Sequence, residues 1–272
     1  MALSVNTNTG AMAALQSLSA TNRDLSTTQS RINTGMNVAS TKDDSASYSI
    51  AQTLRGELGG LKAVSSSLSR AKSTTDVAVA GAEQVSDLLN QMKAKAIEAS
   101  DEGLSTESRA AIGKDFTALK EQMSTIIDSS SFNGTNLLKA SGGTVKALQS
   151  TDTTAATLDV ANQDFTAVVT AIGTTFTDAA TAKTMVATLK TQADAVNGKL
   201  SVLGSASRKI DAQSTFVGKL SDTIDAGIGN LVDADLAKES AKLQALQVKQ
   251  QLGVQALSIA NQAPQSITSL FR

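Results

Sequence analysis

The sequence lacks cysteine, histidine and tryptophan, and it has one tyrosine and one proline among 272 residues. Without cysteine or histidine, the chain cannot build a Ser-His-Asp or Cys-His nucleophile, a zinc site with the usual nitrogen and sulfur ligands, or a thiol redox centre. No disulfide can hold the fold, so packing or assembly must stabilise the chain if it works outside the cell. The only kind of catalytic site that this composition still allows is one built from carboxylates or lysine.

The charge balance gives the protein no strong electrostatic field. The 24 basic and 25 acidic side chains leave a formal net charge of -1, which disfavours nucleic acid and anionic lipid as partners. The first residues form no basic region followed by an apolar one, and no apolar run approaches the roughly 18 residues of a membrane span. We therefore expect no nucleic-acid binding and no membrane insertion, and these rules alone predict a cytosolic protein.

The composition favours long helices, because proline is scarce and the residues are 41% apolar but only 3% aromatic. Between Leu61 and Ala99, apolar or small residues recur at alternating steps of three and four, which is typical of a heptad seam. At about 1.5 Å per residue, a helix of this length measures about 60 Å. The seam positions are Leu61, Val64, Leu68, Ala71, Thr75, Ala78, Ala82, Val85, Leu89, Met92, Ala96 and Ala99.

Two further stretches have helical spacing. Residues 112–126 follow the helix-start signals at 105–106 and predict a shorter helix antiparallel to the first. Helical spacing returns over 186–224 and predicts a second long rod, with a slip in phase between Leu203 and Ile210.

The middle of the chain has a different composition. Residues 133–134 are Asn-Gly, which readily adopts the positive φ values of a tight turn. Short β-type runs at 145–148 and 158–160 predict a small β-hairpin region. Residues 151–200 contain thirteen threonines and no serine, so we expect an outward-facing segment that tolerates change.

Both ends of the chain lack charge. Residues 1–22 and 250–271 contain no charged side chain, although 18% of the whole sequence is charged. Both ends also carry apolar stripes with seven-residue repeats, which predict amphipathic helices. The simpler interpretation is a helix pair that closes an intramolecular bundle, whereas the uncharged outer faces favour burial in an assembly. The stripes contain Leu15, Leu18, Leu25 and Ile32 at one end and Leu236, Leu243, Leu246 and Leu257 at the other.

Three segments carry a resemblance to a known family. Residues 32–46 read INTGMNVASTKDDSA, residues 131–138 read SFNGTNLL, and residues 230–247 read NLVDADLAKESAKLQALQ. The last match continues through QLGVQALSIANQA at 251–263 to the final Phe-Arg. On these segments the chain resembles the bacterial flagellins, the subunits of the flagellar filament.

The resemblance extends over roughly residues 1–140 and 185–272. It implies a mainly α fold, with long antiparallel helical rods in a folded-back hairpin and a small β-hairpin region in mid-chain. The outer core layer would hold two helices, the β-hairpin and a short Thr-rich variable segment. The implied divisions are an N-terminal inner-core helix and spoke at 1–42, this outer core layer at 43–182, a returning outer-layer helix at 183–229 and a C-terminal inner-core helix at 230–272.

The resemblance also implies a function. A flagellin is a structural subunit, not an enzyme, which needs no cofactor or metal and self-assembles into the helical flagellar filament for swimming motility. It is exported unfolded by the flagellar type III route, so the expected location becomes secreted, extracellular and flagellar instead of cytosolic. The implied partners are further copies of the chain, a flagellar export chaperone, the filament cap and the hook-junction proteins, and co-assembly with similar flagellins stays open.

The family mechanism assigns the two ends to the polymerisation interface, where they pair as helices in the innermost tube of the filament. Lys42 is expected in a polar network between subunits. Asp43 and Asp44 form an acidic pair that could bind a metal or act as acid and base, but helix capping is the favoured interpretation. The expected interface residues are Leu15, Leu18, Leu25, Ile32, Leu236, Leu243, Leu246, Leu257, Ile267 and Phe271.

Several alternatives stay open. The threonines of 151–191 are either plain solvated side chains or acceptors of O-linked glycans, as in some flagellins. Asn37 and Ala39 depart from the Arg and Asn that many members have, and Gln91 stands where the family's receptor-recognition stretch has Arg. A non-polymeric signalling rod like a chemoreceptor hairpin is the alternative outside the family, and a hook-filament junction protein is the nearest alternative inside the flagellum.

Overall fold

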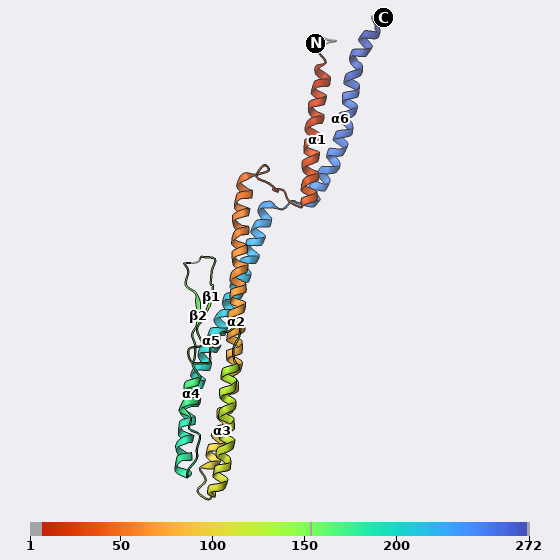
Figure 1. Ribbon diagram of the computed structural model, residues 1–272. Helices are drawn as coiled ribbons and strands as arrows, with labels where there is room; N and C mark the ends of the chain where they lie inside the picture. The colour runs from red at the N-terminus through yellow and green to blue at the C-terminus, as the bar shows by residue number, and fades with distance from the viewer. Residues whose placement is uncertain (1–6, 153, 271–272) are drawn as a thin grey trace. The chain divides into compact units, whose positions relative to one another are not determined.

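The computed structural model describes residues 7–152 and 154–270, and their side chains as far as residue 262. Within this part of the chain there are six helices and one two-stranded antiparallel sheet (Figure 1). This confirms the predicted mainly α fold of long antiparallel helices with a small β region. The elements are α1 (Thr9–Thr34), α2 (Ser45–Ala99), α3 (Thr106–Ser129), β1 (Val145–Ala147), β2 (Leu158–Val160), α4 (Thr166–Ala171), α5 (Ala179–Val232) and α6 (Leu236–Leu270).

The chain divides into two compact units. The terminal unit consists of residues 1–56 and 223–272, and it contains α1, α6, the beginning of α2 and the end of α5. The central unit consists of residues 57–222 and contains all the other elements.

The core of the central unit follows the heptad seam of α2. Every seam position predicted between Leu61 and Ala99 is buried, which confirms the prediction residue by residue. The connection to α3 is closed by Arg109, whose Nε and Nη2 atoms donate to the carbonyl oxygens of Ala99 at 2.9 Å and Asp101 at 2.8 Å. These bonds satisfy carbonyls at the C-terminus of α2 and place a cation near its partial negative charge.

The predicted slip in the phase of α5 is wrong. Buried side chains recur every seven residues without interruption at Ala182, Leu189, Val196, Leu203, Ile210 and Val217. Between Leu203 and Ile210, the alternate seam position 207 is a serine instead of an apolar residue, and serines follow at the equivalent positions 214 and 221. A serine is small enough to face a neighbouring helix, so the seam continues although its apolar pattern is interrupted.

The turn and the strands in mid-chain are confirmed. Asn133 and Gly134 have φ values of 49° and 78°, and Phe132 and Thr135 exchange backbone hydrogen bonds across them at 3.0 Å. In the sheet, Val145 pairs with Val160 and Ala147 with Leu158.

The segment after the turn packs tightly on α2. A Cβ atom added at Gly81 would lie 2.2 Å from the Oγ atom of Ser130 and 2.9 Å from a methyl group of Leu138. Only glycine therefore allows this approach.

The Thr-rich segment is only partly outward-facing. Its threonines are mostly exposed, but Phe165, Val168, Ile172 and Phe176 are buried. The rings of Phe176 and Phe116 of α3 meet edge to face, with centroids 4.9 Å apart. The expectation of a tolerant segment is therefore wrong for these apolar residues, and α4 within it was not predicted.

Candidate assembly surface

The helices α1 and α6 pack against each other in the terminal unit (Figure 1). On α1 the side chains of the seam repeat every seven residues in two series, one apolar and one of threonines. Thr21 and Thr28 are buried, whereas the apolar members are half-buried. The members are Leu18, Leu25 and Ile32 in the first series and Thr21 and Thr28 in the second.

The α6 side of the seam is also mixed. Glu239 and Leu246 are buried, and Leu243, Gln250, Gly253 and Leu257 are half-buried. A Cβ atom added at Gly253 would lie 3.2 Å from a methyl group of Leu18. The two backbones therefore approach closely, through a thin contact with few large buried side chains.

Three polar contacts fix the alignment of the two helices. Near one end, the Nδ2 atom of Asn8 donates to the carbonyl oxygen of Ala260 at 2.7 Å. In the middle, the Nε2 atom of Gln250 donates to the Oδ1 atom of Asn22 at 2.8 Å. At the other end, the Nη1 atom of Arg31 lies 3.3 Å from the Oε1 atom of Glu239. Residue numbers rise along α1 as they fall along α6, so the helices are antiparallel.

The ion pair of Arg31 and Glu239 is well shielded from water. The exposed fraction of the side chain is 10% for Glu239 and 27% for Arg31. Three further polar atoms here are buried without a hydrogen-bond partner among the described residues: Glu239 Oε2, Arg31 Nε and Thr28 Oγ1. Buried polar groups without partners destabilise a fold. A shift of α1 along α6 that broke the bond between Arg31 and Glu239 would therefore destabilise the helix pair.

The segment that follows α1 forms backbone hydrogen bonds with the segment that precedes α6. Helix α1 ends at Thr34 and is capped by Gly35, which has a φ of 70° and accepts a bond from the backbone N–H of Ala234 at 2.9 Å. The N–H groups of Asn37 and Val38 both donate to the carbonyl of Val232. A small core forms beside these segments, with Val38, Ala51, Ile228 and Val232 buried.

Asp43 and Asp44 accept hydrogen bonds from nearby backbone groups in the segment between α1 and α2. The Oδ2 atom of Asp43 accepts bonds from the backbone N–H of Ser40 at 2.9 Å and of Ala39 at 3.1 Å. Asp44 accepts at Oδ1 from the backbone N–H of Ala46 at 2.9 Å, at the first turn of α2.

The pKa of each carboxyl lies below its ordinary value, mainly because a serine hydroxyl donates to it, from Ser40 to Asp43 and from Ser47 to Asp44. Their contribution to stability is therefore present above the unfolded pKa and is lost as pH falls through the folded one. The side chain of Lys42 is exposed, and it forms no hydrogen bond or ion pair among the described residues.

An apolar stripe lies on the outer side of α6, about half a turn away from its seam with α1. Val248, Leu252 and Ile259 are 56%, 58% and 68% exposed. The sequence reasoning missed these residues, although steps of four and seven place them on one helix face. Met12 and Leu15 are likewise exposed on α1.

The predicted interface residues fall into three groups. Leu15 and Leu236 are exposed. The members in the seam between α1 and α6 are half-buried, except Leu246, which is buried: Leu18, Leu25, Ile32, Leu243, Leu246 and Leu257. Ile267 and Phe271 lie outside the described side chains.

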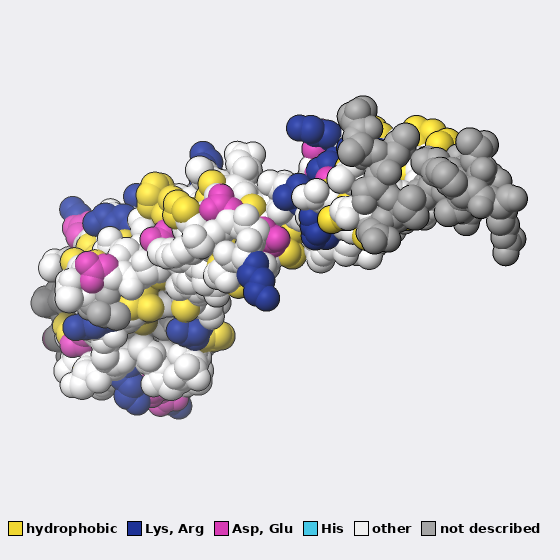
Figure 2. Space-filling view, turned by 90° about the horizontal axis from the view of Figure 1, so that it is seen from above, with side chains coloured by type: hydrophobic (Ala, Val, Ile, Leu, Met, Phe, Trp, Pro, Cys, Tyr) yellow, Lys and Arg dark blue, Asp and Glu magenta, His cyan; other side chains and the backbone are white. Residues whose placement is uncertain are grey.

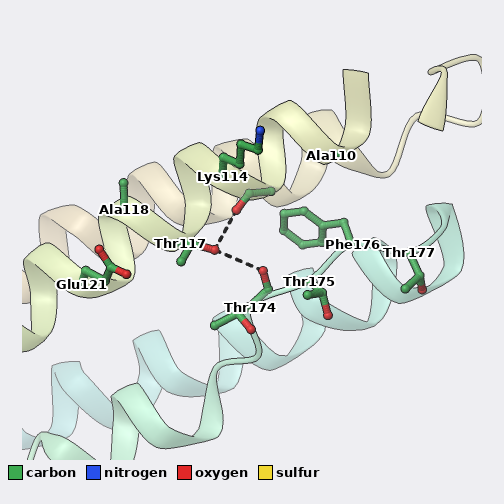
Figure 3. A pocket seen from close by; sticks show the side chains of 10 residues that line it. Ala110, Lys114, Thr117, Ala118, Glu121, Thr174, Thr175, Phe176 and Thr177 are labelled. Carbon is green, nitrogen blue, oxygen red and sulfur yellow. Dashed lines mark hydrogen bonds between the residues drawn. The ribbon is translucent and has the colours of Figure 1, made fainter. Parts of the chain in front are cut away.

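A groove of about 530 Å³ lies between α3 and residues 174–177 (Figure 3). The hydroxyl of Thr117 bonds there to the carbonyl oxygens of Gly113 at 2.9 Å and Thr174 at 3.2 Å. Lys114 and Glu121, its charged side chains, lie two turns apart on α3, and neither forms an ion pair within the described part of the chain. The groove offers no pair of groups within reach for proton transfer.

Charged side chains of both signs are interspersed over the surface that Figure 2 shows, with apolar side chains between them. In the described ranges, no helix carries an apolar stretch long enough to cross a membrane. The same residues contain no cluster of three acidic side chains that could hold a metal ion.

Long paired helices, a thin seam between the terminal helices and an uncovered apolar stripe define a helical structural protein. Comparison with known proteins agrees. The profile of the bacterial flagellin N-terminal helical region matches residues 5–143, and that of the C-terminal helical region matches residues 186–271.

Relatives match over nearly the whole chain. Flagellins FljK and FljM of Caulobacter vibrioides are 48% and 47% identical, each over 99% of this chain and 98% of their own length. A flagellin of Brucella melitensis is 36% identical over 99% of both chains. The chain belongs to the bacterial flagellin family. It is thus a structural component of the flagellar filament and not an enzyme.

Proposed function

We propose that the paired helices α1 and α6 are the part of the chain through which it polymerises into a filament that drives swimming. The observation that carries the proposal is the stripe of Val248, Leu252 and Ile259, which the described part of the chain leaves exposed. Burying each large aliphatic side chain contributes about 1.5–3 kcal/mol. A contact between this stripe and a different surface of the next copy is heterologous, and when the rotation between copies does not close a ring, repeated contacts produce a helical filament.

The same proposal includes export of the unfolded chain by the flagellar type III route. Without cysteine and with a single proline, the chain has almost no disulfide or prolyl steps, which take seconds to hours and would delay refolding at the growing tip. The expected partners are other copies of the chain, an export chaperone, the filament cap and the hook-junction proteins. Several flagellins of one organism, Caulobacter vibrioides, resemble the chain over its length, which supports co-assembly with similar subunits.

The test is Leu252→Asp, which places a charge in the middle of the stripe. We expect the variant to stay a soluble helical subunit and to lose polymerisation, because each contact would bury an unpaired carboxylate. Pelleting of filaments measures assembly, and circular dichroism measures helix content.

Ser240→Asp is the matched control, since it adds the same charge at an exposed position of α6 outside the stripe. It should assemble like the parent protein. Normal filaments from Leu252→Asp would refute the assignment of the stripe to the interface.

A further inference from the structure

A hollow of about 210 Å³ lies in the central unit, between α2, the turn at 132–135 and the beginning of β1. Its floor is formed by Ser67 and Thr74 of α2, which are buried. The Oγ atom of Ser67 accepts the backbone N–H of Leu148 at 3.2 Å, which holds the chain after β1 against α2. The hollow is therefore formed by segments that packing and hydrogen bonds keep in place.

The hollow is lined by two cations, Arg70 and Lys146, and by no acidic side chain. Neither cation forms an ion pair among the described residues, and Arg70 donates only to the Oγ atom of Ser66, at 3.1 Å. Four of the other lysines of the central unit have acidic partners, namely Lys72, Lys95, Lys139 and Lys183, whereas Lys114 and Lys190, like Lys146, form no ion pair among the described residues.

The nearest acidic residue in the sheet does not neutralise Lys146. Asp159 stands opposite Lys146 in the register of β1 and β2. Its carboxylate accepts a bond from the hydroxyl of Thr157 at 2.6 Å and forms no ion pair with Lys146. Neither cation of the hollow is thus held in a salt bridge within the described part of the chain.

Neutral donors surround the same space. The side chains of Asn133, Thr135 and Thr144 line the hollow, and none of them has a hydrogen-bond partner in the described ranges. The hydroxyl of Ser67 accepts a bond and so keeps its own proton to donate. Convergent donors with two cations and no acceptor carboxylate are the features of an anion site.

We propose that this hollow binds one small oxyanion, a sulfate, a phosphate or a carboxylate. The planar guanidinium of Arg70 can hold two oxygens, and Lys146 supplies a point charge. The hollow of about 210 Å³ has room for a small oxyanion. The oxyanion comes either from solution or from an acidic side chain of a second copy of the chain.

Calorimetric titration of the full-length, unpolymerised protein with sodium sulfate tests the site, with sodium chloride of equal ionic strength as reference and sodium acetate as a carboxylate probe. We expect sulfate to bind above the chloride background. Arg70→Gln and Lys146→Gln should each weaken its binding at least tenfold, because each removes a charge-assisted bond.

Arg208→Gln and Lys190→Gln are the matched controls, since both residues are exposed on α5 and form no ion pair among the described residues. They should bind sulfate like the parent protein. No heat beyond the chloride reference, or equal binding by all four variants, would overturn the proposal.

Assembled filaments then identify the source of the oxyanion. If filaments retain labelled sulfate as well as free subunits do, the ligand is an ion from solution. If assembly expels the sulfate, a carboxylate of the neighbouring copy occupies the site. The calorimetric result does not depend on filament formation, so its failure would leave the proposed assembly surface untouched.

Discussion

Single polar residues decide how α1 and α6 align. Of the described residues of these two helices, Leu246 is the one apolar side chain that is buried, while Thr21, Thr28 and Glu239 are buried polar ones. An apolar seam would tolerate a shift along the helix axis, but a shielded charge must keep its partner. A single buried polar residue can fix the register of paired helices in this way.

We predict that Glu239→Gln weakens assembly, because it leaves Arg31 partly buried without its counter-charge. Breaking a fully buried ion pair costs about 3–5 kcal/mol, and we expect about 1–2 kcal/mol here because Arg31 is partly exposed. About 1.4 kcal/mol corresponds to a tenfold rise in the critical concentration for polymerisation, which pelleting at several protein concentrations measures.

Two further variants complete this test. Asp24→Asn removes an exposed carboxylate of α1 that has no ionic partner among the described residues, and its critical concentration should not change. The double variant Arg31→Met with Glu239→Leu should recover much of the lost affinity, since apolar residues can replace a buried pair. An unchanged critical concentration for Glu239→Gln would contradict the role of the pair.

Among the elements, α2 and α5 owe their stability to uninterrupted seams in the central unit. We predict that Leu203→Ala lowers the free energy of unfolding by about 2–5 kcal/mol, because Leu203 is fully buried and its truncation leaves a cavity. Val202→Ala, at a neighbouring position that is 49% exposed, should change it by less than about 0.5 kcal/mol. Urea denaturation followed by circular dichroism compares the two variants, and equal losses would contradict the continuous seam.

The sequence predicts an element well where its pattern is unbroken. The seam from Leu61 to Ala99 has an apolar or small residue at every position, so this part of α2 could be predicted residue by residue, whereas its first turns from Ser45 were not. In α5 the serines at 207, 214 and 221 interrupt the apolar pattern, so the sequence did not show that the seven-residue repeat of buried side chains continues. Around Phe165 and Phe176, the threonine-rich composition predicted an exposed segment, although the apolar residues within it form a buried cluster.

The candidate site was predicted only in part. The charge-free ends and their heptads located the helices that pair, but the heptad pattern selected the seam between α1 and α6 and not the outer stripe around Leu252. A search for a second apolar face on α6 could have found that stripe. No local pattern could have paired Arg31 with Glu239, because these residues lie far apart in the chain and meet only after folding.

At the scale of the whole molecule, the terminal and central units have different cores. The buried seams of α2 and α5 lie in the central unit, whereas the terminal unit depends on α1 and α6 covering each other. We predict that deletion of residues 1–22 leaves a soluble, partly helical subunit that cannot polymerise, because the deletion removes much of α1. Circular dichroism and pelleting measure the two properties, and robust filaments from the truncated chain would contradict the assignment.

Helix α6 carries a seam on one side and an apolar stripe on the other. If the stripe is an assembly contact, each arriving copy covers one stripe and presents a fresh stripe of its own. The growing end then has the same affinity for the next copy at every length. Such a polymer contains no internal measure of its own size, so its length reports how long and how fast subunits were supplied.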